Sequence, residues 1–158
     1  MAADLKDYMA FLAEVAEETG NEAFKAVDEE GLVALTVDET FTLNLQFVAA
    51  ASKVLCFAPV CTLPPEASRE LYRELLVAGL FGQETAGGFF ALEPESETVV
   101  YNYLVDFDPQ TLSPKAFERL LEKILGMVEL WRERLAQRLE ATPELPMELP
   151  TADAIFHP

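Results

Sequence analysis

Seven consecutive residues, Phe41 to Phe47, alternate apolar and polar side chains without a break. This alternation is the pattern of a strand with one buried face. The apolar run "LVALTV", which ends at Val37, lies just before it, and only Asp38, Glu39 and Thr40 separate the two runs. Because strands joined by so short a connection pair antiparallel, the sequence predicts a half-buried β-hairpin.

A helix and a further strand flank the predicted hairpin. The spacing of apolar side chains predicts a helix from Leu5 to Thr19, with Asp4 as its N-cap and Gly20 just after its end. After the hairpin, "VLCFAPV" is apolar at consecutive positions, as in a strand covered on both faces, which predicts a strand that is either central or covered. The apolar stripe expected on the first helix is Leu5, Met9, Leu12, Val15 and Ala16.

The second half of the chain predicts two more helices around a second pair of strands. "LPPEASRELYRELLVAGLF" indicates a helix that opens at its prolines and ends at about Gly79 or Gly82. Strands are expected at residues 89–92 and in "TVVYNYLVDF". Ser113 is the expected N-cap of a last helix, which Gly126 interrupts for close packing. Its predicted core stripe is Phe117, Leu120, Leu121, Ile124, Val128, Trp131 and Leu135.

The predicted order of elements is α-β-β-β-α-β-β-α. Short connections between successive strands favour a twisted, mainly antiparallel sheet with helices segregated on one side, which is an α+β fold. We expect a single domain over residues 1–141 and a proline-rich tail over residues 142–158. A mobile tail is the default interpretation, and the alternative is that Leu145, Met147 and Leu149 dock in a groove of the domain.

Charge and hydropathy exclude several classes of partner. The 158 residues carry a net charge of -17, which would repel the phosphate backbone, so nucleic acid is not an expected partner. No uncharged apolar run reaches the roughly 18 residues of a membrane span. The N-terminus mixes acids into its apolar residues, unlike a secretory signal, so we expect a cytoplasmic protein without membrane insertion.

The side chains that carry most enzyme chemistry are scarce. His157, the only histidine, lies in the tail, so Ser-His, Cys-His and zinc arrangements lack a member and we expect no metal site. Cys56 and Cys61 would lie roughly 16 Å apart along a strand, too far for a disulfide, and are interpreted as buried core thiols.

The glycines of "GLFGQETAGG" are not followed by the Gly-Lys-Ser/Thr of a phosphate loop. The acidic stretches "DEEG" and "DFD" lack the spacing of a calcium loop and are interpreted as solvated turns. Paired carboxylates are uninformative among 28 acidic residues. We therefore predict no cofactor and no enzymatic activity.

The second helix carries more apolar side chains than one sheet face would bury. Adjacent phenylalanines on the next strand must point to opposite faces of the sheet. We therefore predict a self-association surface, and the alternative is that loops or the tail cover these side chains. The residues expected in a homodimer interface are Tyr72, Leu76, Leu80, Phe81, Phe89 and Phe90.

The stretches "LPPEASRELYRELLVAGLF", "TAGGFFAL", "TVVYNYLV" and "WRERL" occur in this order within an acidic chain. From about Leu5 to Leu139 the chain resembles the class I type III secretion chaperones, the Tir-chaperone-like family. The resemblance implies a non-enzymatic bacterial homodimer in the cytoplasm. It also implies that the protein holds the N-terminal segment of a secreted effector in an extended state, and that it dimerises through the second helix and the neighbouring strand.

An extended effector segment can be bound by strand addition and shallow apolar pockets, and the first helix and hairpin are the expected platform. Residues 1–50 hold eleven acidic and two basic side chains, which would steer a basic client there or would simply keep the protein soluble. Two rival functions remain: a protein-binding or regulatory domain of the same fold unrelated to secretion, and an α+β enzyme or small-ligand module. The residues expected to bind the effector are Phe11, Val15, Leu35, Val37, Phe41, Leu43, Leu45 and Phe47.

Overall fold

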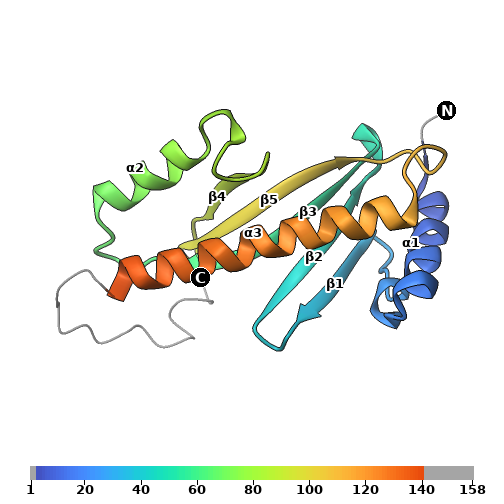
Figure 1. Ribbon diagram of the computed structural model, residues 1–158, viewed down its shortest axis with the longest axis horizontal. Coiled ribbons are helices and arrows are strands. Elements are labelled where there is room, and N and C mark those ends of the chain that lie inside the picture. Colours follow the sequence, from blue (N-terminus) through green and yellow to red (C-terminus); the bar gives the residue numbers. More distant parts are fainter. Residues whose placement is uncertain (1–2, 141–158) are drawn as a thin grey trace. The chain divides into compact units, whose positions relative to one another are not determined.

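The computed structural model describes residues 3–140, so the predicted tail lies outside the described residues (Figure 1). The helices are α1 (Leu5–Thr19), α2 (Arg69–Ala78) and α3 (Pro114–Glu140). The strands are β1 (Leu32–Val37), β2 (Phe41–Val48), β3 (Lys53–Thr62), β4 (Phe89–Glu93) and β5 (Thr98–Asp106). The short 3-10 helices are η1 (Glu22–Lys25), η2 (Ala49–Ala51) and η3 (Leu80–Gly82). The helices and strands follow the predicted order.

The five strands form one sheet in the order β1-β2-β3-β5-β4. β1 pairs antiparallel with β2, β2 with β3, and β4 with β5. The predicted α+β class is therefore confirmed. The described chain divides into two compact units, one of residues 3–58 and 103–125 and the other of residues 59–102 and 126–140. β3, β5 and α3 each run through both units.

The ends of α1 are fixed by the residues that the sequence indicated. Asp4 accepts a hydrogen bond from the Asp7 backbone N–H at 2.9 Å, and the Asp7 carboxylate accepts one from the Asp4 N–H at 3.0 Å. Gly20 follows the helix in the left-handed conformation, with φ 71°. The predicted stripe was wrong at Met9, which is exposed, because Tyr8 and Phe11 turn toward the core instead.

The predicted hairpin is confirmed, and Val37 opposes Phe41 across its turn. Asp38 and Glu39 both adopt positive φ, 47° and 59°, which gives the turn the twist that two antiparallel strands require. On β2 every second side chain from Phe41 to Phe47 is buried. The alternation in the sequence therefore corresponds to one core face and one partly exposed face.

Aromatic rings from α1, β2, α3 and the end of β5 form the core of the first unit. The Tyr8 ring stacks on Phe47 with centroids 5.0 Å apart, and Phe107 packs edge-on against both rings. Phe11 of α1 contacts Phe117 of α3 at 5.4 Å. These contacts place α1 and the first half of α3 on the same face of the sheet.

β3 is central, as predicted, and only its alternate side chains are buried, so its second face is half-buried. Two details of the other predicted elements were wrong. α2 begins after the prolines, because Ser68 is its N-cap and accepts a hydrogen bond from the Leu71 N–H at 3.2 Å. Gly126 is exposed with open space around it, so it serves no close packing.

The core stripe of α3 follows the prediction at six of seven positions, and only Leu120 is half-buried. The Ser113 hydroxyl accepts a hydrogen bond from the Ala116 N–H at 3.1 Å, as expected of an N-cap. Trp131 is fully buried on this stripe. The long amphipathic helix therefore buries one continuous side in the core.

Both cysteines lie on β3, but only Cys56 is buried, and Cys61 is half-buried. Burial raises the pKa of Cys56 to about 12, and it raises the pKa of Cys61 to about 11 although the nearby Arg132 guanidinium opposes the shift.

Since the thiolate is the reactive form, native Cys61 should react at pH 8 at least about 100-fold more slowly than a free cysteine, and Cys56 more slowly still. Ellman's reagent measures these rates. Rapid reaction of both thiols in guanidinium is the control, and native reaction at the free-thiol rate would contradict the assignment.

Candidate functional site

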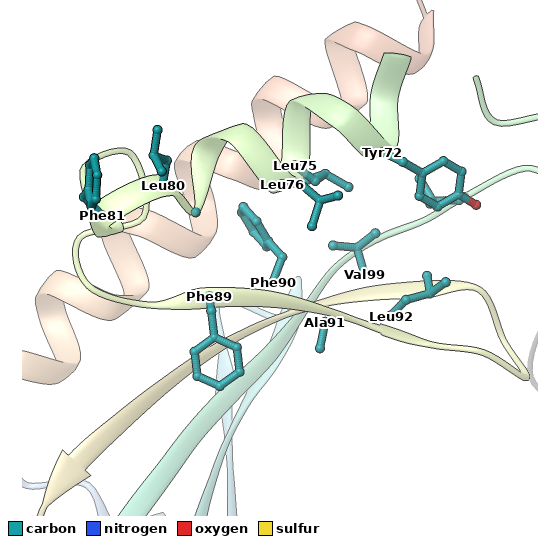
Figure 2. A pocket seen from close by; sticks show the side chains of 12 residues that line it. Tyr72, Leu75, Leu76, Leu80, Phe81, Phe89, Phe90, Ala91, Leu92 and Val99 are labelled. Atoms are coloured by element: carbon teal, nitrogen blue, oxygen red, sulfur yellow. The ribbon is translucent and has the colours of Figure 1, made fainter. Parts of the chain in front are cut away.

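An apolar groove of about 440 Å³ lies between α2 and β4 in the second unit (Figure 2). Its floor includes Leu75 and Val99, which are buried. All six residues that the sequence predicted for self-association line this groove. They are Tyr72, Leu76, Leu80, Phe81, Phe89 and Phe90.

These six side chains differ in how much of their surface reaches solvent. Leu76 is 80% exposed and Phe81 is 86% exposed, whereas Phe90 is half-buried. The Phe90 ring packs against Trp131 of α3 with centroids 4.9 Å apart. Figure 2 shows Phe90 pointing from β4 toward α2 and Phe89 pointing to the other side of the strand, as the alternation of a strand requires. The groove therefore exposes a contiguous apolar surface anchored to the core by Phe90.

The glycine-rich loop before β4 is held by hydrogen bonds from buried side chains. The Tyr101 hydroxyl donates to the Thr85 carbonyl at 2.7 Å, and the Thr85 hydroxyl donates to the Gly88 carbonyl at 2.7 Å. The Trp131 indole N–H donates to the Glu84 carbonyl at 2.9 Å. This loop therefore fixes where β4 begins.

Phe81 has an unusual backbone conformation at the end of α2. Its φ of 57° and ψ of 12° lie in the left-handed region, which bulky side chains rarely adopt. Such a conformation costs on the order of 1–3 kcal/mol and persists only where surrounding contacts enforce it. This conformation could not be predicted from the sequence, because left-handed residues are normally anticipated only at Gly, Asn or Asp.

An ion-pair cluster joins α2 to the second half of α3. The Glu74 carboxylate lies 3.0 Å from Arg138 Nε and 3.6 Å from Arg134 Nη2. The Arg134 guanidinium also stacks over the Trp131 ring, 4.6 Å from its centroid. These contacts support the side of α2 away from the groove.

The residues predicted to bind the effector lie on α1, β1 and β2, as expected, but few of them reach solvent. Seven of the eight are buried, and only Val37 is half-buried. They point into the core because the face of the hairpin that alternation makes apolar is the face packed by α1 and α3. In this structure these side chains belong to the core, and their contact with an effector stays a prediction. The buried residues are Phe11, Val15, Leu35, Phe41, Leu43, Leu45 and Phe47.

β1 is an edge strand, since it stands at one end of the strand order. Its side chains Ala34 and Thr36 are exposed. Exposed acids lie at both ends of the strand: Asp28 and two glutamates precede it, and the turn with Asp38 follows it. The Asp28 carboxylate caps its own turn by accepting from the N–H groups of Glu30 and Leu32 at 2.9 Å each. β1 is therefore an edge strand flanked by negative charge.

Residues 3–140 contain neither a cluster of metal ligands nor a membrane-spanning helix. No group of three or more His, Cys, Asp or Glu side chains there can hold a metal ion. No helix in this part of the chain has the length and apolar character needed to cross a membrane.

The model of the Tir chaperone protein (CesT) family matches residues 10–132. The chain belongs to the CesT family. A Chlamydia pneumoniae protein is 27% identical to this CesT-family chain over 106 residues, which are 66% of this chain and 78% of that protein.

Solved structures share the fold of this CesT-family chain. In the HopA1-SchA chaperone-effector complex, the similar chain has a TM-score of 0.65 at 19% identity, and the match covers 83% of this chain and 98% of that one. In the ExsC-ExsE complex, the similar chain has a TM-score of 0.67 at 22% identity, and the match covers 82% of this chain and 93% of that one. The Yersinia pestis type III secretion chaperone SycH, in complex with a fragment of YscM2, has a TM-score of 0.60 at 19% identity. The match covers 78% of this chain and 98% of that one.

Proposed function

We propose that this protein is a dimeric, non-enzymatic chaperone that holds an extended N-terminal segment of a type III secreted effector in the bacterial cytoplasm. The observation that carries the proposal is the CesT family match, which spans most of the chain. Solved proteins of the same fold support it, because they include a chaperone-effector complex and a type III secretion chaperone.

The homodimer is supported by the α2–β4 groove. Leu76, Leu80 and Phe81 are largely exposed in one copy of the chain, and a surface of this kind is stabilised when a second apolar surface covers it. The same groove argues against the small-ligand alternative. Among the described residues that line it, only Tyr72 carries a polar side-chain group, whereas a small-ligand site needs several converging polar groups.

The client is expected at the β1 edge. An extended segment that pairs with β1 would satisfy its own backbone groups by strand addition, and this requires no core side chain to move. The acids at both ends of β1 would favour a segment with basic side chains. Assigning the groove to a second copy and the β1 edge to the client leaves both surfaces usable at once.

Co-expression with the effector encoded beside the gene tests the proposal. The chaperone account predicts a stable complex in which limited proteolysis leaves the effector's N-terminal segment intact and digests the same segment without the chaperone. Sedimentation equilibrium of the chaperone alone should give twice the 17.5 kDa of one chain. An effector that is equally digested with and without the chaperone would contradict the chaperone function, and a 17.5 kDa particle at micromolar concentration would contradict the dimer.

A further inference from the structure

β4 stands at the end of the strand order, so one of its edges pairs with no strand of residues 3–140. Four of its five residues are exposed, and only Phe90 is half-buried. Such an edge presents backbone N–H and C=O groups with which a further extended segment can pair. The apolar α2–β4 groove runs along this strand. The β4 edge therefore offers backbone pairing and apolar contacts at the same place.

α3 runs antiparallel to α2 in the second unit. Arg138 Nε of α3 lies 3.0 Å from the Glu74 carboxylate of α2. Two turns earlier in α3, the Trp131 indole N–H donates to the carbonyl of Glu84, which follows α2. The last residue of α3, Glu140, therefore lies beside the N-terminal half of α2.

The chain that follows α3 can reach the groove within a few residues. Figure 2 shows Tyr72 of α2 and Leu92 of β4 at the same end of the groove. To enter there, the chain must pass α2, which is about 10 Å across, and residues 141–144 span up to about 13 Å when extended. From that end it would run toward Phe81, and so antiparallel to β4, which ends near Tyr72.

The sequence of residues 145–149 suits a strand in this position. These five residues match the five of β4 in length, and the apolar ones are Leu145, Met147 and Leu149. In an extended segment their side chains share one face, and their N–H and C=O groups share one edge. Pro146 and Pro150, which lack an N–H, then face away from β4. This is the side on which an edge strand tolerates proline.

Charge favours the groove over the hairpin as the place where this segment binds. Residues 141–150 carry two acidic and no basic side chains. Residues 69–92 carry two arginines and three glutamates, whereas residues 1–50 carry eleven acidic and two basic side chains. The segment is therefore repelled far less at the groove. Covalent attachment also gives it an effective concentration on the order of millimolar.

We propose that residues 145–149 add to the β4 edge of their own chain and cover the α2–β4 groove until a second copy displaces them. The segment and a second copy need the same apolar surface, so they compete for it. The dimer then forms only at a higher concentration than free grooves would allow. The effect on assembly rests on the proposed homodimer, but the docking itself does not.

The first test places a proline on either side of the added strand. Met147→Pro removes an N–H that would face β4, so it should release the segment. Two copies dimerise only when both grooves are free, so a segment that covers each groove about two thirds of the time weakens the dimer about tenfold. Met147→Pro should therefore lower the dissociation constant of the full chain about tenfold, as measured by sedimentation equilibrium.

Glu148→Pro is the matched control, because the N–H of Glu148 would face solvent, as Pro146 and Pro150 do. Its dissociation constant should stay within about twofold of wild type. Equal tightening by both variants would show that the segment does not pair as a strand. An unchanged constant for both would show that the segment does not cover the groove.

The second test is amide exchange, which needs no dimer. At a concentration where the full chain is monomeric, the amides of Leu145, Met147 and Leu149 should exchange at least about threefold more slowly than in an unfolded peptide of the same sequence. Met147→Pro should abolish this protection at the other two. Amides that exchange at the peptide rate at every concentration would overturn the docking. Protection that appears only in the dimer would overturn it too, because the segment would then bind the second copy.

The docking and the homodimer can fail separately. A wild type that stays monomeric while the three amides are protected supports the docking and contradicts the dimer. A dimer that forms while these amides exchange at the peptide rate contradicts the docking and leaves the proposed function in place.

Discussion

Replacing Leu76 by aspartate is expected to convert the proposed homodimer into monomers at micromolar concentration. Leu76 is 80% exposed in one copy and lines the α2–β4 groove, so the change leaves the core of the monomer intact. In the dimer the new carboxylate would be desolvated without a partner, in addition to the lost apolar contact. We expect the dissociation constant to rise at least about 100-fold, or about 2.7 kcal/mol. Sedimentation equilibrium over a range of concentrations measures the change.

Leu130→Asp is the matched control for this variant. Leu130 is 52% exposed on α3 and is not among the residues that line the groove, so it introduces the same charge on another surface of the second unit. Its dissociation constant should stay within about threefold of wild type. If both variants dissociate equally, the added charge rather than the groove is responsible, and the assignment of the interface is wrong.

Replacing Gly88 by alanine is expected to destabilise the folded protein strongly. A Cβ at this buried position would overlap the Tyr101 ring and lie 2.7 Å from the Asn102 carbonyl oxygen. The Tyr101 ring is itself fixed by its hydrogen bond to Thr85 at 2.7 Å, so relief requires the loop or β4 to move. We expect the free energy of unfolding to fall by about 3 kcal/mol, the upper end of the range for overpacking. Urea denaturation followed by circular dichroism measures the change at fixed protein concentration.

Gly126→Ala is the control, and this substitution is expected to raise the free energy of unfolding. Gly126 lies within α3, is exposed, and has nothing within 4 Å of an added Cβ. Because alanine is the better helix former, this variant should gain about 0.5–1 kcal/mol. A similar loss at both glycines would show that the Tyr101 contact does not determine the effect.

Local pattern in the sequence was sufficient for most of the fold. The alternation of Phe41 to Phe47 predicted β2 and its buried face, and the capping residues Asp4 and Ser113 predicted where two helices begin. These signals depend on residues close together in the chain, which is why they are readable without a structure. The excess apolar surface of α2 and β4 was readable in the same way, because one sheet face has a limited area to cover it.

The predictions from sequence were wrong where packing between residues far apart in the chain determines which side chains are buried. Met9 and Tyr8 are adjacent on α1, and either could belong to its buried side. Tyr8 is the buried one because its ring packs against Phe47 and Phe107. The alternation of β1 and β2 identified apolar residues such as Leu43 but gave no information on whether helices or a client cover them. The left-handed conformation of Phe81 depends on the Gly79–Gly87 turn as a whole, so no single residue signals it.

Amide hydrogen exchange of the chaperone, with and without the N-terminal segment of its effector, shows which surface the client covers. The segment should slow exchange in β1, residues Leu32–Val37, because strand addition covers that edge. Exchange in β4, residues Phe89–Glu93, should stay unchanged, because in the proposed dimer a second copy covers the groove. Slowed exchange in α2 and β4 with β1 unaffected would contradict the account, since the client would then occupy the surface assigned to the dimer.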